Sequence, residues 1–171
     1  MLNKITTFIK YLLGKSSELK DLETKDALLA KVVLDIHRKR THSEFISVPL
    51  FALKQIHAID RENAVAATNE RVEKLKAVKQ ALLQHKHFSQ AVLAEYLPSV
   101  SAIKVVKQSD NSYVAYEGNG RLVALQQVFS PDDLITIEVE EYKFKNPHKI
   151  LKRMAKVRTL NGLDDKHQGG S

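Results

Sequence analysis

The chain has 171 residues and a net charge of +7, with 27 lysines and arginines against 20 aspartates and glutamates, and it has no cysteine. This length fits one domain, or one domain with a helical extension, that can bury a sizeable core. The lack of cysteine excludes disulfides, zinc sites built from thiolates and cysteine nucleophiles. The moderate positive charge is compatible with nucleic acid, a nucleotide or another anion as partner. No apolar run is long enough to span a membrane, so we expect a cytoplasmic protein.

Residues 1–43 predict a helical extension. Apolar residues recur at helical spacing over residues 2–13 and again over residues 19–36. Such helices pack on their own domain or on a partner subunit, so a homodimer contact through them is one expectation. The second helix ends in a basic cluster, Arg38, Lys39 and Arg40. Cations there suit the negative end of a helix dipole, and they also suit contacts with nucleic-acid phosphates.

Residues 44–145 carry the patterns of both strands and helices. The apolar stretch over residues 46–59 is interrupted by Pro49, which favours an edge strand that leads into a turn or short helix. Residues 61–88 are rich in helix formers and predict one long helix with an apolar stripe. Residues 89–97 predict a short helix that ends before Pro98.

Strand patterns dominate after Pro98. Residues 101–117 alternate around a central group of turn residues and predict a hairpin, and residues 134–144 predict a closing strand. Residues 121–129 are apolar at helical spacing. Residues 146–171 predict a basic helix around 150–157 and then a flexible tail. The fold class expected is therefore α+β, a small mixed sheet with packed helices.

The turn Gly118-Asn119-Gly120-Arg121 stands between a predicted strand and a predicted helix. Glycine adopts backbone angles closed to other residues and allows close approach of a ligand. A helix that begins here directs unpaired N–H groups and its positive dipole end into the turn, and Arg121 adds a guanidinium suited to phosphate. Asn119 suits either a phosphate contact or a left-handed turn position. Lys104, on the neighbouring strand, would line the same anionic groove.

Glu117 is the carboxylate nearest to this turn. It suits a magnesium ligand or a general base if the ligand is a nucleotide with Mg²⁺, and it equally suits the solvated end of a strand. His85 and His87 are the only close pair of histidines, and side chains two apart on a helix do not share a face. We therefore expect no metal site built by the protein from histidines.

The segment from Ser101 to Leu125 resembles the central hairpin and the G-x-x-R-x-x-A box of the ParB and sulfiredoxin-like superfamily, with Gly118, Arg121 and Ala124 on the box. The resemblance covers residues 44–142, because residues 46–56 are similar to the entry strand and residues 135–142 to the closing strand. It implies a nucleotide or another phosphorylated ligand whose phosphates lie over the box. The Gln-Pro pair of the CTP-binding members and the cysteine of the sulfiredoxins are both missing from this chain.

The stretch Glu117 to Arg121 also matches the centre of the loop of Fic-domain proteins, which transfer nucleotide fragments to hydroxyl groups. Tyr113 stands where that family has its general-base histidine. Predicted strands precede and follow the unit, whereas the Fic loop joins two helices. The ParB-like resemblance is therefore the one favoured.

Three functions follow from these patterns. The first is a module that binds or switches with a nucleotide or other phosphorylated ligand at the turn. The second is a metal-dependent enzyme of phosphoryl transfer or phosphodiester cleavage that uses Glu117. The third is a nucleic-acid-binding protein that uses Arg38, Lys39, Arg40 and the basic tail. The sequence does not decide whether the chain is an enzyme.

Overall fold

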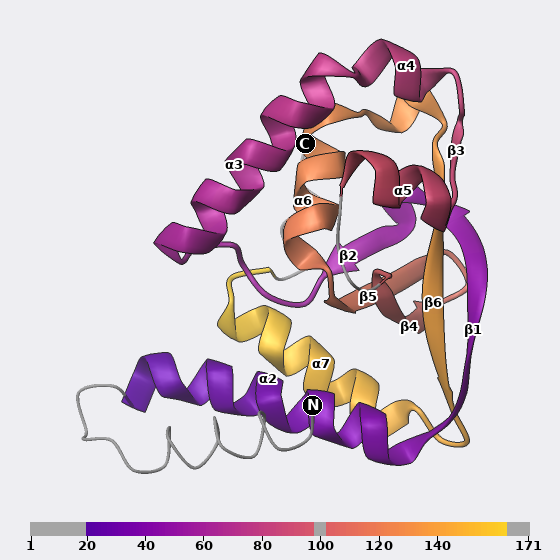
Figure 1. Cartoon of the computed structure of the whole chain (residues 1–171). Coiled ribbons are helices and arrows are strands. Elements are labelled where there is room, and N and C mark those ends of the chain that lie inside the picture. Colours follow the sequence, from indigo (N-terminus) through magenta and orange to yellow (C-terminus); the bar gives the residue numbers. More distant parts are fainter. Residues whose placement is uncertain (1–19, 98–101, 164–171) are drawn as a thin grey trace, which may run out of the picture.

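A computed structural model describes residues 20–97 and 102–163 of the chain, which form an α+β fold on one mixed six-stranded sheet (Figure 1). The strands are β1 (Arg40–Pro49), β2 (Leu53–Gln55), β3 (His87–Phe88), β4 (Lys104–Ser109), β5 (Ser112–Glu117) and β6 (Thr136–Phe144). Their order is β1-β6-β4-β5-β2, and β3 also pairs with β6. The coarse fold class predicted from the sequence is confirmed.

Strand β6 is the common partner of three strands. It pairs antiparallel with β1 along its whole length, and parallel with β4 and with β3 on its other side. Strands β4 and β5 form the predicted hairpin, and β2 runs parallel to β5 at the other edge of the sheet. The hairpin and β6 therefore fix the position of the turn that follows β5.

Helices cover both faces of the sheet (Figure 1). One face carries α3 (Glu62–Ala77), α4 (Lys79–Leu83), α5 (Gln90–Tyr96) and α6 (Asn119–Val128). The other carries α2 (Lys20–Lys39) and α7 (His148–Leu160), which lie side by side. Two short 3₁₀ turns, Leu50–Ala52 and Pro131–Asp133, complete the connections. None of the helices in these ranges is long and apolar enough to cross a membrane.

Each helical layer packs on the sheet and covers a separate hydrophobic core. Between the sheet and α3 to α6 lie apolar side chains that include Val72, Leu75, Phe88, Leu122 and Leu125. Between the sheet and α2 and α7 lies a smaller cluster that includes Val32, Ile36, Tyr116, Tyr142 and Met154. The buried positions on each helix recur every three to four residues, as a helix with one apolar face requires.

The long helix predicted over residues 61–88 is broken in the structure. Helix α3 ends at Ala77, the shorter α4 follows, and Lys86 takes a φ of +55° before β3. Phe88 is fully buried and pairs with Ile137 of β6. Burial of this ring and pairing with the sheet override the helix propensity of the segment.

The first strand begins earlier than predicted. Strand β1 starts at Arg40, because residues 40–45 already pair with residues 140–144 of β6. The domain boundary drawn between residues 43 and 44 therefore falls inside this strand. The helix predicted over residues 2–13, with its proposed dimer contact, and the flexible tail from residue 164 lie outside the described residues.

Candidate anion-binding site

The turn at Gly118 joins β5 directly to α6. Gly118 has a φ of +90°, in the left-handed region that favours glycine. A Cβ on it would lie 3.0 Å from Cγ1 and 3.2 Å from Cα of Ile103, so a side chain has no room. The N–H groups of residues 119–121, at the start of α6, precede the first hydrogen-bonded turn of the helix and point out of its end.

Asn119 locks this turn to the segment after β2. Its Oδ1 accepts a hydrogen bond from the Ile56 N–H at 2.8 Å, and its Nδ2 donates to the Ala115 carbonyl at 2.9 Å. The side chain is buried. The Asn119 amide therefore binds backbone groups, which is neither of the two roles predicted for it. The residue in the left-handed conformation is Gly118 instead.

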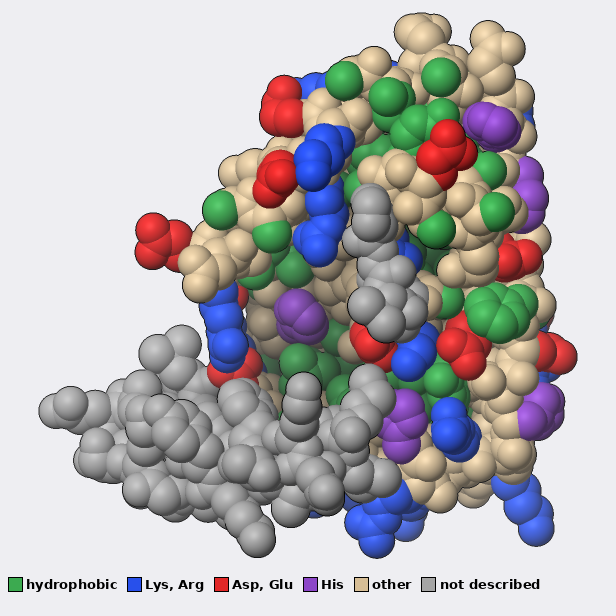
Figure 2. All heavy atoms as spheres, in the orientation of Figure 1, with side chains coloured by type: hydrophobic (Ala, Val, Ile, Leu, Met, Phe, Trp, Pro, Cys, Tyr) green, Lys and Arg blue, Asp and Glu red, His purple; other side chains and the backbone are tan. Residues whose placement is uncertain are grey.

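Helix α3 crosses the start of α6 at Gly120. A Cβ on Gly120 would lie 2.9 Å from Nη1 of Arg71 and 3.3 Å from Oγ1 of Thr68. Glycine here lets the Arg71 guanidinium and the Thr68 hydroxyl reach the first turn of α6. Figure 2 shows basic side chains along α3, above a hollow in this face of the molecule.

Arg121 brings a second guanidinium to the same turn, and its side chain is only 6 % exposed. No hydrogen bond or ion pair within residues 20–97 and 102–163 involves Arg71 or Arg121, and the buried Thr68 hydroxyl has no hydrogen-bond partner among them. Burial, and next the charge of Arg71, lower the pKa of Arg121, while Glu117 acts in the opposite direction. We name Thr68, Arg71, Gly120 and Arg121 the anion cluster.

Lys104 and Glu117 form an ion pair beside the turn, with Nζ and Oε2 separated by 3.1 Å. Burial lowers the pKa of Lys104, but the hydrogen bond and charge of Glu117 outweigh it and the net pKa is raised. The carboxylate of Glu117 is thus engaged with a cation. In the described ranges no group of three or more acidic or histidine side chains that could hold a metal ion is found.

A histidine that sequence reasoning did not single out lies beyond this pair. The His37 ring packs edge to face on Tyr116 and Tyr142, with centroids 6.0 and 5.8 Å away. Its Nε2 is buried and has no hydrogen-bond partner in the described part of the chain. Burial, followed by the charges of Arg40 and Lys104, lowers the pKa of His37. A neutral imidazole is thereby favoured.

The basic cluster Arg38, Lys39 and Arg40 lies at the junction of α2 and β1, on the layer opposite to α6. All three side chains are exposed, and the Arg40 guanidinium lies 5.3 Å from the centroid of Tyr142. The structure therefore does not bring this cluster together with the anion cluster. Exposed lysines of α7 extend the same layer, at positions Lys149, Lys152 and Lys156.

The anion cluster combines residues that the sequence analysis named with two that it missed. Gly120 and Arg121 were predicted, whereas Thr68 and Arg71 on α3 were not. The spacing of Thr68 and Arg71 could have indicated them. They continue the buried stripe of Val72 and Leu75 toward the start of the helix, and polar residues stand there at positions where apolar ones would be expected.

Comparison of the chain with protein-family models, with curated proteins and with solved structures finds no match. The ParB-like resemblance therefore stays a prediction, and the function has to be inferred from the chemistry of the site.

Proposed function

We propose that this protein binds a nucleotide or another phosphorylated small molecule at the start of α6, and that it acts as a binding or switching module. The observation that carries the proposal is a pair of guanidinium groups that make no ion pair within residues 20–97 and 102–163, one of them buried, at a helix start that a glycine keeps open. An uncompensated buried cation is costly unless an anion joins it.

Phosphate is the anion that this arrangement fits best. The first turn of α6 contains no acidic residue, and its free N–H groups and dipole favour negative charge. Planar guanidinium groups bind phosphate oxygens in pairs, and the Thr68 hydroxyl adds one more donor. A phosphate bound here would neutralise Arg71 and Arg121 and would supply the hydrogen bonds that Thr68 lacks.

The ligand would also connect separate elements. Arg71 comes from α3, and Arg121 from α6, whose start Asn119 ties to Ile56. A phosphate held between these elements would restrain α3 against α6. Ligand binding would therefore change how the helices of this layer pack.

The two alternatives rest on other residues. A metal-dependent enzyme would need Glu117 for a metal ion or as a base, and this carboxylate is paired with Lys104. Nucleic-acid binding would use Arg38, Lys39 and Arg40, and it would weaken steeply with salt whether or not Arg121 is present. Neither alternative explains why Arg71 and Arg121 make no ion pair in the part of the chain that the structure describes.

The proposal is tested by thermal unfolding with inorganic pyrophosphate, ATP, CTP and GTP, each with and without Mg²⁺. A ligand that binds only the folded state stabilises it, by about 2.7 kcal/mol at a concentration one hundred times Kd. We expect at least one of these compounds to raise the Tm of the wild type, and Arg121→Ala and Arg71→Ala to abolish that rise.

Two matched variants complete the design. Arg38→Ala removes the same charge from the opposite layer and should keep the ligand-induced rise. Gly120→Ala places a methyl group against the Arg71 guanidinium and should weaken the rise while both arginines remain. An equal rise in wild type and Arg121→Ala, or no rise with any compound, would refute the proposal.

A further inference from the structure

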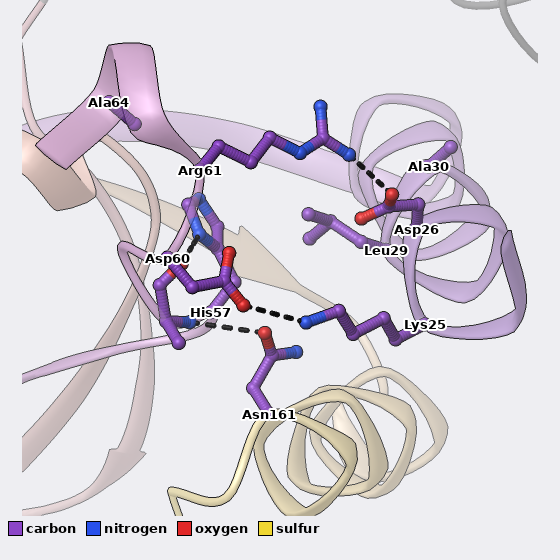
Figure 3. A pocket seen from close by; sticks show the side chains of 10 residues that line it. Lys25, Asp26, Leu29, Ala30, His57, Asp60, Arg61, Ala64 and Asn161 are labelled. Carbon is purple, nitrogen blue, oxygen red and sulfur yellow. Dashed lines mark hydrogen bonds and ion pairs between the residues drawn. The ribbon is translucent and has the colours of Figure 1, made fainter. Parts of the chain in front are cut away.

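A cavity lined by α2, α7 and the segment that leads into α3 is a second feature of the described residues. It has a volume of about 370 Å³ and opens between α2, the segment over residues 57–64 and the end of α7 (Figure 3). Sites for small organic ligands begin at roughly 300 Å³, so this cavity is of sufficient size. Helix α2 forms one of its walls.

Two segments of chain run from the walls of this cavity to the anion cluster. On α3, Ala64, Thr68 and Arg71 are spaced by four and three residues and so share one face of the helix. Ala64 lines the cavity, whereas Thr68 and Arg71 reach Gly120. On the opposite side, the Ile56 N–H is bound by Asn119, and the next residue, His57, lines the cavity.

The charges that line the cavity are already paired with each other. Lys25 Nζ lies 2.9 Å from Asp60 Oδ2, and Arg61 is paired with Asp26, so both ion pairs link α2 to the opposite wall (Figure 3). Between them, the walls present the side chains of Leu29, Ala30 and Ala64. This lining offers an apolar surface with polar edges and no uncompensated charge.

The backbone N–H and carbonyl of Ala58, in the cavity wall, both have partners. Asn161, at the end of α7, accepts a hydrogen bond from the Ala58 N–H at 3.1 Å, and the His57 Nδ1 lies 2.9 Å from the Ala58 carbonyl. The cavity is therefore pre-formed by three separate segments of chain. A neutral group that enters it needs to displace no ion pair.

We infer that this cavity is the second half of the ligand site, and that it receives the uncharged organic part of a phosphate ester whose phosphates lie on the anion cluster. The inference rests on the proposed function and narrows it: the ligand is an organic phosphate, such as a nucleotide, and not a free inorganic anion. Because α2 forms one wall and α3 the other, the bound molecule joins the two helical layers of the protein.

The test compares ligands that carry the same phosphates with and without an organic part. Binding of inorganic pyrophosphate, ADP, CDP, GDP and UDP to the full chain is measured by calorimetry. We expect at least one nucleoside diphosphate to bind tenfold or more tightly than pyrophosphate. In Ala64→Leu, which fills the cavity from α3, we expect this advantage to fall below threefold while pyrophosphate binds as in the wild type.

Ala66→Leu is the matched control, since the same change on the exposed side of α3 should leave both affinities unchanged. Ala64→Met, with a more flexible side chain, replaces Ala64→Leu if the latter does not fold. Equal binding of all five compounds to the wild type, or an advantage that survives both substitutions at position 64, would overturn the inference. Failure of the proposed function is recognised separately, because pyrophosphate binding would then be absent or independent of Arg121.

Discussion

Two buried arginines show how differently this protein uses the same side chain. Arg158 of α7 is 8 % exposed, and its guanidinium donates to the carbonyls of Gln55 and Leu163. Arg121 of α6 is 6 % exposed and has no such bond in the described part of the chain. The first arginine joins α7 to β2 and to the residues that follow α7. Of the described charges, another cation, Arg71, and the carboxylate of Glu117 act on the second.

On the function proposed above, the difference separates a structural arginine, Arg158, from a ligand-binding one, Arg121. A buried guanidinium that is saturated with carbonyl oxygens stabilises the fold, because its desolvation is offset by charge-assisted hydrogen bonds. A buried guanidinium without them reduces stability, and proteins retain such costs mainly where function requires them. This contrast can be measured, since the two arginines should respond to one substitution with opposite signs.

Arg158→Met should give the largest effect, a loss of stability. The substitution leaves the carbonyls of Gln55 and Leu163 without their donor, and unsatisfied buried polar groups cost roughly 2–6 kcal/mol for two groups. Urea unfolding at neutral pH measures this free energy. A loss below about 0.5 kcal/mol would mean that Arg158 is not the structural residue described here.

Arg121→Met should change stability in the other direction. Methionine keeps the length and apolar stem of the side chain and removes a buried charge that faces Arg71, so the free energy of unfolding without ligand should rise by roughly 1–3 kcal/mol. The same variant should lose the stabilisation by phosphorylated ligands. A loss of stability in the unliganded variant would show that Arg121 stabilises the fold as Arg158 does, and would contradict the difference drawn between the two arginines.

His37 should give a smaller, pH-dependent effect that sharpens the comparison. Its buried Nε2 also has no hydrogen-bond partner among the described residues, but the imidazole avoids the cost of a buried charge by remaining neutral. Burial and the charges of Arg40 and Lys104 lower the pKa in the folded state below 6.5, against the opposing charges of Glu117 and Glu140. The unfolded chain therefore binds the proton more readily, and stability is lost as the pH falls below about 6.5.

The corresponding variant is His37→Gln, compared with the wild type by urea unfolding from pH 8 to pH 5. The wild type should lose up to about 1.4 kcal/mol more per pH unit than the variant in the acidic range, and the two should run parallel above pH 7. Identical slopes over the whole range would show that His37 is protonated as easily in the folded protein as in the unfolded chain.

The sequence predicted most of the fold, because its elements are specified locally. The alternation of residues 101–117 predicted the hairpin, and Gly118 marked the junction of strand and helix that the structure shows. The end of the helical segment at Lys86 was not predictable, since the following strand forms only where Phe88 pairs with Ile137 of β6, far away in the sequence. The start of β1 was missed for the same reason, because its first residues are polar and are ordered by β6.

The candidate site was predictable only in part. Gly120 and Arg121 are adjacent in the sequence, and their residue types predict an anion-binding site. Thr68 and Arg71 join them only because α3 packs across α6, which no local pattern reports. The cavity depends on α2, α7 and residues 57–64 meeting in space, so its existence could not be inferred from the chain alone.

The pairing of β1 with β6 also determines the order in which the molecule can fold. Ser43 and Glu140, whose side chains are hydrogen-bonded at 2.8 Å, are 97 residues apart in the chain. During synthesis from the N-terminus, β1 cannot pair with β6 until β6 has been synthesised. A strand that stays unpaired during this time is prone to aggregate. Contacts between residues so far apart in the sequence form slowly. The edge of the sheet that carries the exposed Phe45 should therefore be the last to form, and the part of the molecule most dependent on protection while the chain is incomplete.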